Sequence, residues 1–291
     1  MALIDKSETY QMTNPGDHID GTDVYQSNPN LLDNPWFTVR QRGDGPFSGA
    51  NTEAFDRWLA TINSTLTGTA NGITITTTVR TWGMQQRVAK GFFTVGKTYT
   101  ISAMEQDGTI TSATFTWTGS GISKYVTGAN VGFEISVSNG NYEQIYFTTN
   151  YVGSVDLKAV KIELGSVSTL ANDTPPDYDR ELEHCKYYFE RIKALGNYAE
   201  FGLGIAQTTG TVYAHIPMHP KRDGNYTIAT NGSFRVISTS GISATGISKY
   251  AHTSTAGNLV VSVTASVTAG QAYRLTANND ANAYIDINND L

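Results

Sequence analysis

One tryptophan with polar neighbours is the strongest candidate for a binding site in this sequence. In "VRTWGMQQR", Trp82 stands close to Arg80 and Gln85. The apolar faces of sugar rings stack on aromatic side chains, and nearby polar groups then hydrogen-bond the hydroxyls. The pattern therefore predicts a glycan site built from Trp82, Arg80 and Gln85. The alternative is that Trp82 packs in a core, which is the commoner place for a tryptophan in a small β domain.

Motifs for catalysis or nucleotide binding are absent from the sequence. It contains no GxSxG elbow, no P-loop and no HExxH. A pair of carboxylates could serve a glycosidase, but the acids of the first β-rich region follow no motif and mostly fall at turns or outward positions. These acids are Glu105, Asp107, Glu134, Glu143, Asp156 and Glu163. We therefore predict a protein that is not an enzyme and has no catalytic residues.

Residues that could bind a metal are scattered. His215 and His219 flank "IPM", where no helix is expected to bring them onto one face, and no cysteine or acid stands beside them. Asp17, Asp20 and Asp23 are spaced three apart, which does not match a calcium loop. We predict no metal site and no cofactor.

Negative charge is concentrated at the start of the chain. The formal net charge is −6, and the first 33 residues hold six acids and one lysine. The rest of the chain is nearly neutral and has no excess of positive charge to attract phosphate backbones, which argues against nucleic-acid binding. The acidic segment either docks on a basic surface or is a solvated tail.

Cysteine content and hydropathy indicate where the chain is made and whether it enters a membrane. Cys185 is the only cysteine, so no internal disulfide is possible. No stretch approaches the roughly 18 apolar residues of a membrane span, and the first residues lack the apolar core of a signal peptide. We expect a chain that is made in a cytoplasm, is not inserted into a membrane, and leaves the cell by another route.

Apolar residues recur at every second position through most of the chain, which indicates strands with one buried face. In the first half these positions are Ile73, Ile75 and Val79; Tyr99, Ile101 and Ala103; Phe115 and Trp117; Phe133, Ile135 and Val137. In the second half they are Val212, Ala214 and Ile216; Phe234 and Val236; Leu259, Val261 and Val263; Ile285 and Ile287. Short turns between them favour antiparallel sandwiches over strand–helix alternation.

One segment has helical spacing. In "ELEHCKYYFERI", residues 181–192, Leu182, Cys185, Phe189 and Ile192 share one helical face. The segment follows paired prolines, which end the preceding strand. Residues 34–43, "NPWFTVRQRG", are instead interpreted as a scaffold strand, with Arg40 and Arg42 on one side and Phe37, Val39 and Gln41 on the other.

These patterns predict an all-β protein: a jelly-roll β-sandwich, then a short helix, then a second, β-sandwich-like tip domain. We place an acidic arm at residues 1–30, the jelly roll at 31–165, a proline-containing linker and helix at 166–194, and the tip at 195–291. The tip contains no tryptophan and only two phenylalanines. Because such a domain has little apolar surface to bury and is only marginally stable alone, we expect it to associate with other chains through the strands near its carboxy terminus. The predicted contact residues are Tyr273, Leu275, Ile285 and Ile287.

Three stretches together resemble bacteriophage and prophage tail-fibre proteins. "NPWFTVRQRG" followed by "FDRWLA" is similar to the opening of such proteins, and "VGKTYTISA" resembles one of their strands. "VDLKAVKIELGSVSTLANDTPPDYDRELEHCKYYFERI" is similar to their junction, with a Glu-Leu-x-x-Cys-x-x-Tyr-Tyr motif. The likeness runs from Asn30 to Ile192. Pro35 and Trp36 depart from the usual pattern, and no individual ligand residue is carried over.

The resemblance implies a jelly roll similar to carbohydrate-binding modules, followed by a tip that forms homotrimers. It implies a virion protein that binds host-surface glycans during attachment, and the acidic arm would then join it to other virion proteins. Two alternatives stay open. One is a structural virion component, such as a head fibre, collar or capsid decoration, that touches no sugar. The other is a glycan-degrading tailspike.

Overall fold

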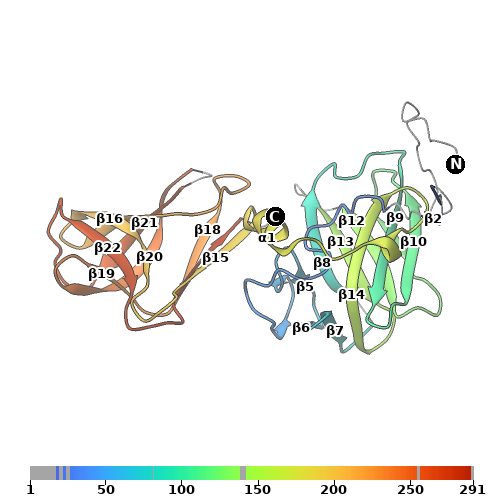
Figure 1. Cartoon of the computed structure of the whole chain (residues 1–291), viewed down its shortest axis with the longest axis horizontal. Coiled ribbons are helices and arrows are strands. Elements are labelled where there is room, and N and C mark those ends of the chain that lie inside the picture. Colours follow the sequence, from blue (N-terminus) through green and yellow to red (C-terminus); the bar gives the residue numbers. More distant parts are fainter. Residues whose placement is uncertain are drawn as a thin grey trace. The chain divides into compact units, whose positions relative to one another are not determined.

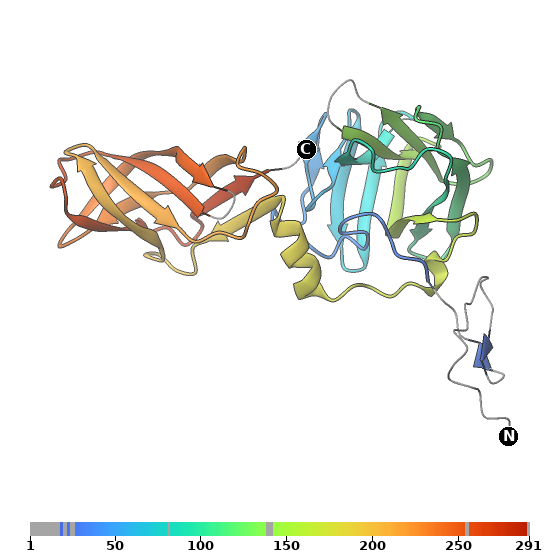
Figure 2. The ribbon, with the colours of Figure 1, turned by 90° about the horizontal axis from the view of Figure 1, so that it is seen from above.

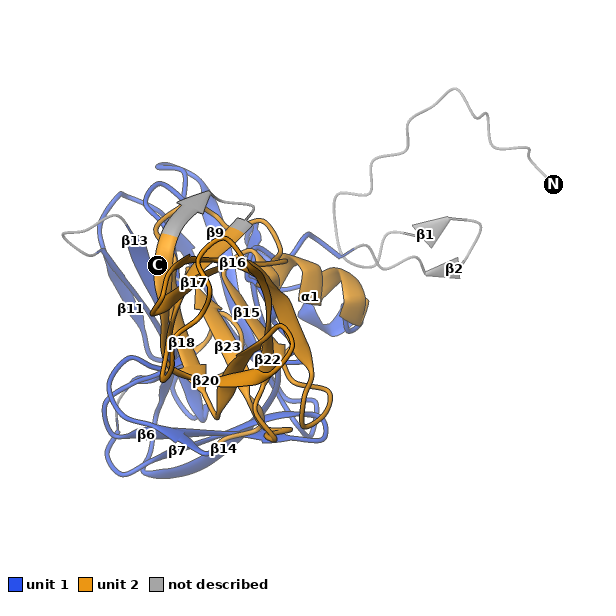
Figure 3. Ribbon diagram, turned by 90° about the vertical axis from the view of Figure 1, so that its left-hand side faces the viewer, with its two compact units in different colours: residues 1–38, 46–52, 59–176 blue, residues 39–45, 53–58, 177–291 orange. Residues whose placement is uncertain are grey.

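The structure, a computed structural model, describes residues 18–19, 22–23, 27–80, 82–137, 142–253 and 256–289. Most of the predicted acidic arm, residues 1–30, and the aspartates at 17 and 20 lie outside the described residues. The chain divides into two compact units, coloured in Figure 3. Unit 1 comprises residues 1–38, 46–52 and 59–176, and unit 2 comprises residues 39–45, 53–58 and 177–291.

Unit 1 is a jelly-roll sandwich of two six-stranded antiparallel sheets, as the alternating pattern predicts (Figure 1). In the first sheet the strand order is β10 (Ile110–Thr116), β9 (Thr98–Glu105), β14 (Gly153–Leu164), β7 (Gly72–Thr77), β6 (Ser64–Thr69) and β3 (Phe47–Ser48). In the second it is β11 (Ile122–Lys124), β12 (Val131–Val137), β13 (Tyr142–Thr149), β8 (Trp82–Ala89), β5 (Leu59–Ala60) and β4 (Thr52–Glu53). The chain passes between the sheets from β3 to β4, from β5 to β6, from β7 to β8, from β8 to β9, from β10 to β11 and from β13 to β14.

The core of unit 1 lies between its sheets and consists of the positions that alternate in the sequence. Ile73, Ile101, Phe133 and Phe147 are each fully buried there. Val79 and Val137 are exceptions: Val79 lies beyond the end of β7, Val137 ends β12, and both are exposed. The unit also contains two short paired strands of two residues each, β1 (His18–Ile19) and β2 (Thr22–Asp23), and a 3-10 turn at Leu170–Asn172.

Unit 2 is also built from antiparallel strands, drawn from yellow through orange to red in Figures 1 and 2. A closed barrel has the order β16 (Glu200–Thr208), β17 (Thr211–Ile216), β21 (Ala256–Val263), β20 (Gly241–Thr253), β19 (Phe234–Ile237) and β22 (Ala272–Ala277). A three-stranded sheet has the order β15 (Phe189–Lys193), β23 (Tyr284–Asn288) and β18 (Thr227–Asn231). The predicted all-β fold with one short helix is confirmed, and the second β domain takes the form of a barrel with an attached sheet.

The helix is shorter than its apolar spacing predicts. Helix α1 runs from Tyr178 to Lys186, and the Asp177 side chain caps it by accepting from the Arg180 N–H at 3.0 Å. Phe189 and Ile192, predicted on the helix, lie instead on β15, where they pair with Asn288 and Ile285 of β23. Aromatic and β-branched residues fit a pleated, half-buried surface. Pairing with a strand almost a hundred residues away therefore overrides the local helical pattern.

The segment around residues 34–43 is a buried scaffold but not a strand. Phe37 and Val39 are fully buried, whereas Asn34 and Phe37 have positive φ angles of 48° and 56°. Those angles place both residues in the left-handed region, which interrupts an extended chain. The predicted strand with arginines on one side is therefore wrong, while the predicted structural role fits the burial.

Residues 39–45 and 53–58 belong to unit 2 although the sequence places them inside the first domain. Gln41 explains this assignment: its Nε2 donates to the Phe189 carbonyl at 2.9 Å, and its Oε1 accepts from the Arg191 N–H at 3.1 Å. The Arg42 guanidinium lies 3.3 Å from the centre of the Phe189 ring. The first and third stretches of the tail-fibre resemblance thus contact each other.

The four predicted association residues are not available to another chain. Tyr273, Leu275, Ile285 and Ile287 are 4%, 1%, 0% and 0% exposed and form part of the core of unit 2. This prediction is wrong because alternation identifies a buried face without identifying what buries it. Here the opposite wall of the same unit buries it.

Candidate functional site

The candidate site lies on the outward face of the second sheet of unit 1. On β13, Ile145 and Phe147 point into the core and are fully buried, so Gln144 and Tyr146 point outward. Tyr146 pairs with Gln85 of β8, and Glu134 of β12 pairs with Tyr146. Three adjacent strands therefore contribute side chains to one surface. We call the outward side chains of Trp82, Gln85, Glu134, Gln144 and Tyr146 the Trp82 face.

Trp82 is a surface residue and not a core residue. Its side chain is 38% exposed, and its indole stacks on the Tyr146 ring with centroids 5.1 Å apart and planes 29° apart. The indole Nε1 donates to Glu134 Oε2 at 2.9 Å. Stacking on one side and a hydrogen bond at the edge fix the ring, and part of its surface stays exposed to solvent. This geometry is that of an aromatic platform.

Tyr146 provides the buried ring on which the Trp82 indole stacks. It is 8% exposed, and burial raises the pKa of its phenol, with the nearby Glu134 carboxylate adding to the shift. The phenol therefore stays protonated across the physiological pH range and keeps an O–H donor beside the indole.

Side-chain amides extend the Trp82 face along β8 and β13. Gln144 Nε2 donates to Gln85 Oε1 at 3.0 Å, and Gln85 Nε2 donates to Asn51 Oδ1 at 2.7 Å. Arg87 Nη2 also donates to Asn51 Oδ1, at 2.8 Å. Gln85 itself is only 2% exposed. It therefore positions Gln144 and Asn51 and presents little surface of its own.

Arg80 lies in a hollow beside the Trp82 face. Its guanidinium is 5.0 Å from the centre of the Tyr125 ring, and both residues line a hollow of about 470 Å³ together with Asn130 and Asn150. Gly132 forms part of this region, since a Cβ there would lie 3.0 Å from Tyr125 Cδ1. Gly132 and Glu134 are two residues apart on β12 and share its outward side.

The three predicted site residues thus have different positions and roles. Trp82 and Gln85 are connected through Tyr146, whereas Arg80 lines the neighbouring hollow. Sequence reasoning missed Tyr146, Glu134 and Gln144. The signal for two of them is present in "YEQIYFTT", where Gln144 and Tyr146 alternate with the apolar Ile145 and Phe147.

Comparisons with known proteins add little to this geometry. No protein-family model and no curated protein sequence matches the chain. Among solved structures, it is similar to the N-terminal CBM22-1–CBM22-2 tandem domain of Xyn10C from Paenibacillus barcinonensis. That likeness has 10% sequence identity and a TM-score of 0.25, and it covers 92% of this chain and 99% of the other. A TM-score of this size carries no argument about function.

Other candidate sites find ordinary structural partners. His215 Nδ1 lies 3.2 Å from Asn258 Oδ1, and His219 Nε2 lies 2.9 Å from Glu183 Oε2. Within the described residues, no group of three or more His, Cys, Asp or Glu side chains is arranged to hold a metal ion. Across the same part of the chain, no helix has the length and apolarity needed to cross a membrane.

Proposed function

We propose that this chain is a subunit of a phage or prophage virion fibre that binds host-surface glycans through the Trp82 face. The observation that carries the proposal is the half-exposed indole of Trp82, held by Tyr146 and Glu134 beside the Gln144 amide. An exposed, immobilised aromatic ring offers a stacking surface for the apolar face of a sugar. Amide and carboxylate groups around it accept and donate hydrogen bonds to hydroxyls.

Binding is favoured over glycan hydrolysis by the composition of the face. Hydrolysis of a glycosidic bond uses two carboxyl groups on opposite sides of the bond. The Trp82 face, as defined by its five residues, contains one carboxylate, Glu134, and that carboxylate already accepts a hydrogen bond from Trp82. A tailspike-like activity therefore has less support than binding.

The virion assignment rests on the three stretches that resemble tail-fibre proteins. Two of them, residues 34–43 and 181–192, are joined by Gln41, which supports interpreting them as parts of one building block. In this proposal the protein is displayed on the particle, associates with copies of itself as a trimer, and joins other virion proteins through residues 1–30.

Glycan binding is tested by measuring the affinity of the purified chain for a panel of host-surface polysaccharides. Replacing Trp82 with alanine removes a stacking contact worth about 1 kcal/mol or more, which weakens binding about fivefold or more. Tyr178→Ala is the matched control, because Tyr178 is 51% exposed but lies on α1 in unit 2. Unchanged affinity of the Trp82 variant would place the glycan site elsewhere, and absence of binding by the parent would favour the purely structural virion component.

Attachment to the particle is tested separately by deleting residues 1–26. We expect the shortened chain to fold and to bind glycans but to be missing from assembled particles, because the acidic segment supplies the docking contact in this proposal. Normal incorporation of the shortened chain would refute the anchoring role.

A further inference from the structure

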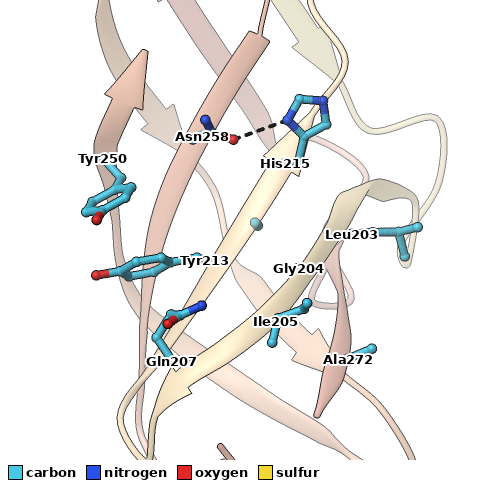
Figure 4. Close-up of a pocket in the computed structure, with 10 residues that line it drawn as sticks. Leu203, Gly204, Ile205, Gln207, Tyr213, His215, Tyr250, Asn258 and Ala272 are labelled. Carbon is cyan, nitrogen blue, oxygen red and sulfur yellow. Dashed lines mark hydrogen bonds between the residues drawn. The ribbon is translucent and has the colours of Figure 1, made fainter. Parts of the chain in front are cut away.

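The outer wall of the barrel in unit 2 carries a stripe of exposed apolar side chains. Leu203 and Ile205 of β16 are 61% and 51% exposed, and Tyr250 of β20 is 55% exposed. Tyr213 of β17 lies beside Tyr250, with ring centroids 4.3 Å apart (Figure 4). We call these four residues the barrel stripe. They line a groove of about 540 Å³.

The four residues of the stripe lie outside the hydrophobic core of unit 2. A bulge in β16 at Glu200–Gly202 lets Phe201 point into the core while Leu203 and Ile205 point outward, and Ala206 then points inward by ordinary alternation. Clustered exposed apolar side chains of this size mark interaction surfaces. The barrel is closed and β16 is paired on both sides, so a partner cannot add a strand there. It must bind through side chains.

We propose that the barrel stripe binds a second copy of this chain. The polar residues at the groove, Gln207, His215 and Asn258, include no acid, lysine or arginine. Interfaces between identical subunits are more apolar than those with transient partners. In addition, the six acids and one lysine of the first 33 residues account for most of the net charge of −6, so little net charge elsewhere in the chain opposes the approach of a second copy.

Charges at the margin of the stripe are also compatible with self-association. Arg274 of β22 pairs in register with Leu203, and its guanidinium lies 3.7 Å from Glu200. Both charged side chains are about half exposed, at 54% and 43%. Each copy therefore has a positively and a negatively charged side chain next to its apolar stripe. A second copy related by a two-fold rotation can place its Arg274 near Glu200 of the first. This proposal rests on the self-association included in the proposed function, for which it names the contact surface, and it does not depend on the glycan site in unit 1.

The proposal is tested by measuring the mass of the full chain in solution by light scattering at 1–100 µM. We expect the parent to have a multiple of the single-chain mass and Leu203→Glu to have the single-chain mass, since a buried charge would oppose the contact. Leu195→Glu is the matched control. Leu195 is 98% exposed and lies between β15 and β16, outside the stripe, so this variant should keep the mass of the parent.

Two results would overturn the proposal. A parent that is a single chain at 100 µM would refute both the stripe and the proposed trimer, whereas a Leu203→Glu variant that folds and keeps the mass of an associated parent would refute the stripe alone. If Leu203→Glu does not fold, Leu203→Ala replaces it and is expected to raise the dissociation concentration roughly tenfold. A dissociation concentration equal to that of Leu195→Ala would then contradict the proposal.

Discussion

The side chain of Gln41 hydrogen-bonds the main chain of Phe189, 148 residues later in the sequence, at 2.9 Å. Gln41 is held for this contact by Asp56, whose carboxylate accepts from the Gln41 backbone N–H at 2.8 Å and from its side-chain amide at 2.6 Å. Two short segments from the early part of the chain are therefore structural parts of unit 2.

Replacing Asp56 with alanine should destabilise unit 2. Asp56 is fully buried, so the substitution leaves both Gln41 donors without this acceptor. The Gln41 side-chain amide keeps the Phe189 carbonyl as an acceptor. A buried donor left unsatisfied costs about 1–3 kcal/mol, so loss of the acceptor for the Gln41 backbone N–H should lower the free energy of unfolding by about 1–3 kcal/mol in chemical denaturation. Asp44→Ala is the control: Asp44 is 71% exposed in its ion pair with Arg40, and its loss should cost about 1 kcal/mol or less. Equal effects of the two substitutions would contradict this account.

The buried lysine of unit 1 offers a second test. Lys161 Nζ is fully buried and contacts Asp173 Oδ1 at 2.7 Å, Thr169 Oγ1 at 2.9 Å and Ser27 Oγ at 2.7 Å. Lys161→Met removes the cation but leaves the Asp173 carboxylate, and breaking a buried pair in this way costs about 3–5 kcal/mol. Lys124→Met, at an exposed position on β11, should change the free energy of unfolding by no more than about 0.5 kcal/mol. A similarly small effect at Lys161 would show that its contacts do not stabilise the fold.

Titration of Glu143 should make the free energy of unfolding depend on pH. Its carboxylate is 4% exposed, and burial raises its pKa above the ordinary value of 4.5, although the N–H groups of Gly91 and Phe93 oppose the shift. The folded state therefore holds this proton more tightly than the unfolded state does, and the ionised carboxylate destabilises the fold above the raised pKa. Glu143→Gln should increase the free energy of unfolding at pH 7, and this gain should disappear as the pH falls below 4.5.

Glu183 provides a control of opposite sign for that experiment. Hydrogen bonds from His219 and Lys186 lower the pKa of Glu183 below 4.5, so its ionised form stabilises the fold at neutral pH. That stabilisation is lost as the pH falls through the lowered pKa. Glu183→Gln should therefore reduce stability at pH 7. A gain in stability for both glutamine variants would contradict the assignment of the two environments.

The strands were predictable because the alternation of buried and exposed side chains is a local property. Ile101 and Ala103 on β9, and Val212 and Ala214 on β17, are buried as their spacing predicts. The end of α1 was not predictable in this way, because pairing with β23 decides the conformation of Phe189. The local spacing around that residue is equally compatible with a helix.

The site was only partly predictable for a similar reason. Composition around Trp82 indicated a binding surface, but the residues that hold the indole, Tyr146 and Glu134, come from two other strands. Only the register between β8, β13 and β12 brings them together. Likewise, the spacing of Tyr273 and Leu275 predicted a buried face, and only the closed barrel shows that the face is internal.

The central claim is that a glycan binds against the indole of Trp82, and intrinsic tryptophan fluorescence tests it most directly. Trp82 is 38% exposed, whereas Trp36, Trp58 and Trp117, the other tryptophans of the chain, are 8%, 1% and 2% exposed. Titration with a host-surface glycan should produce a saturable change in the emission of the parent, because a stacked sugar displaces water from the exposed ring. The change should be absent from Trp82→Phe. An equal emission change in Trp82→Phe, or a glycan that binds the parent without altering its emission, would contradict the account.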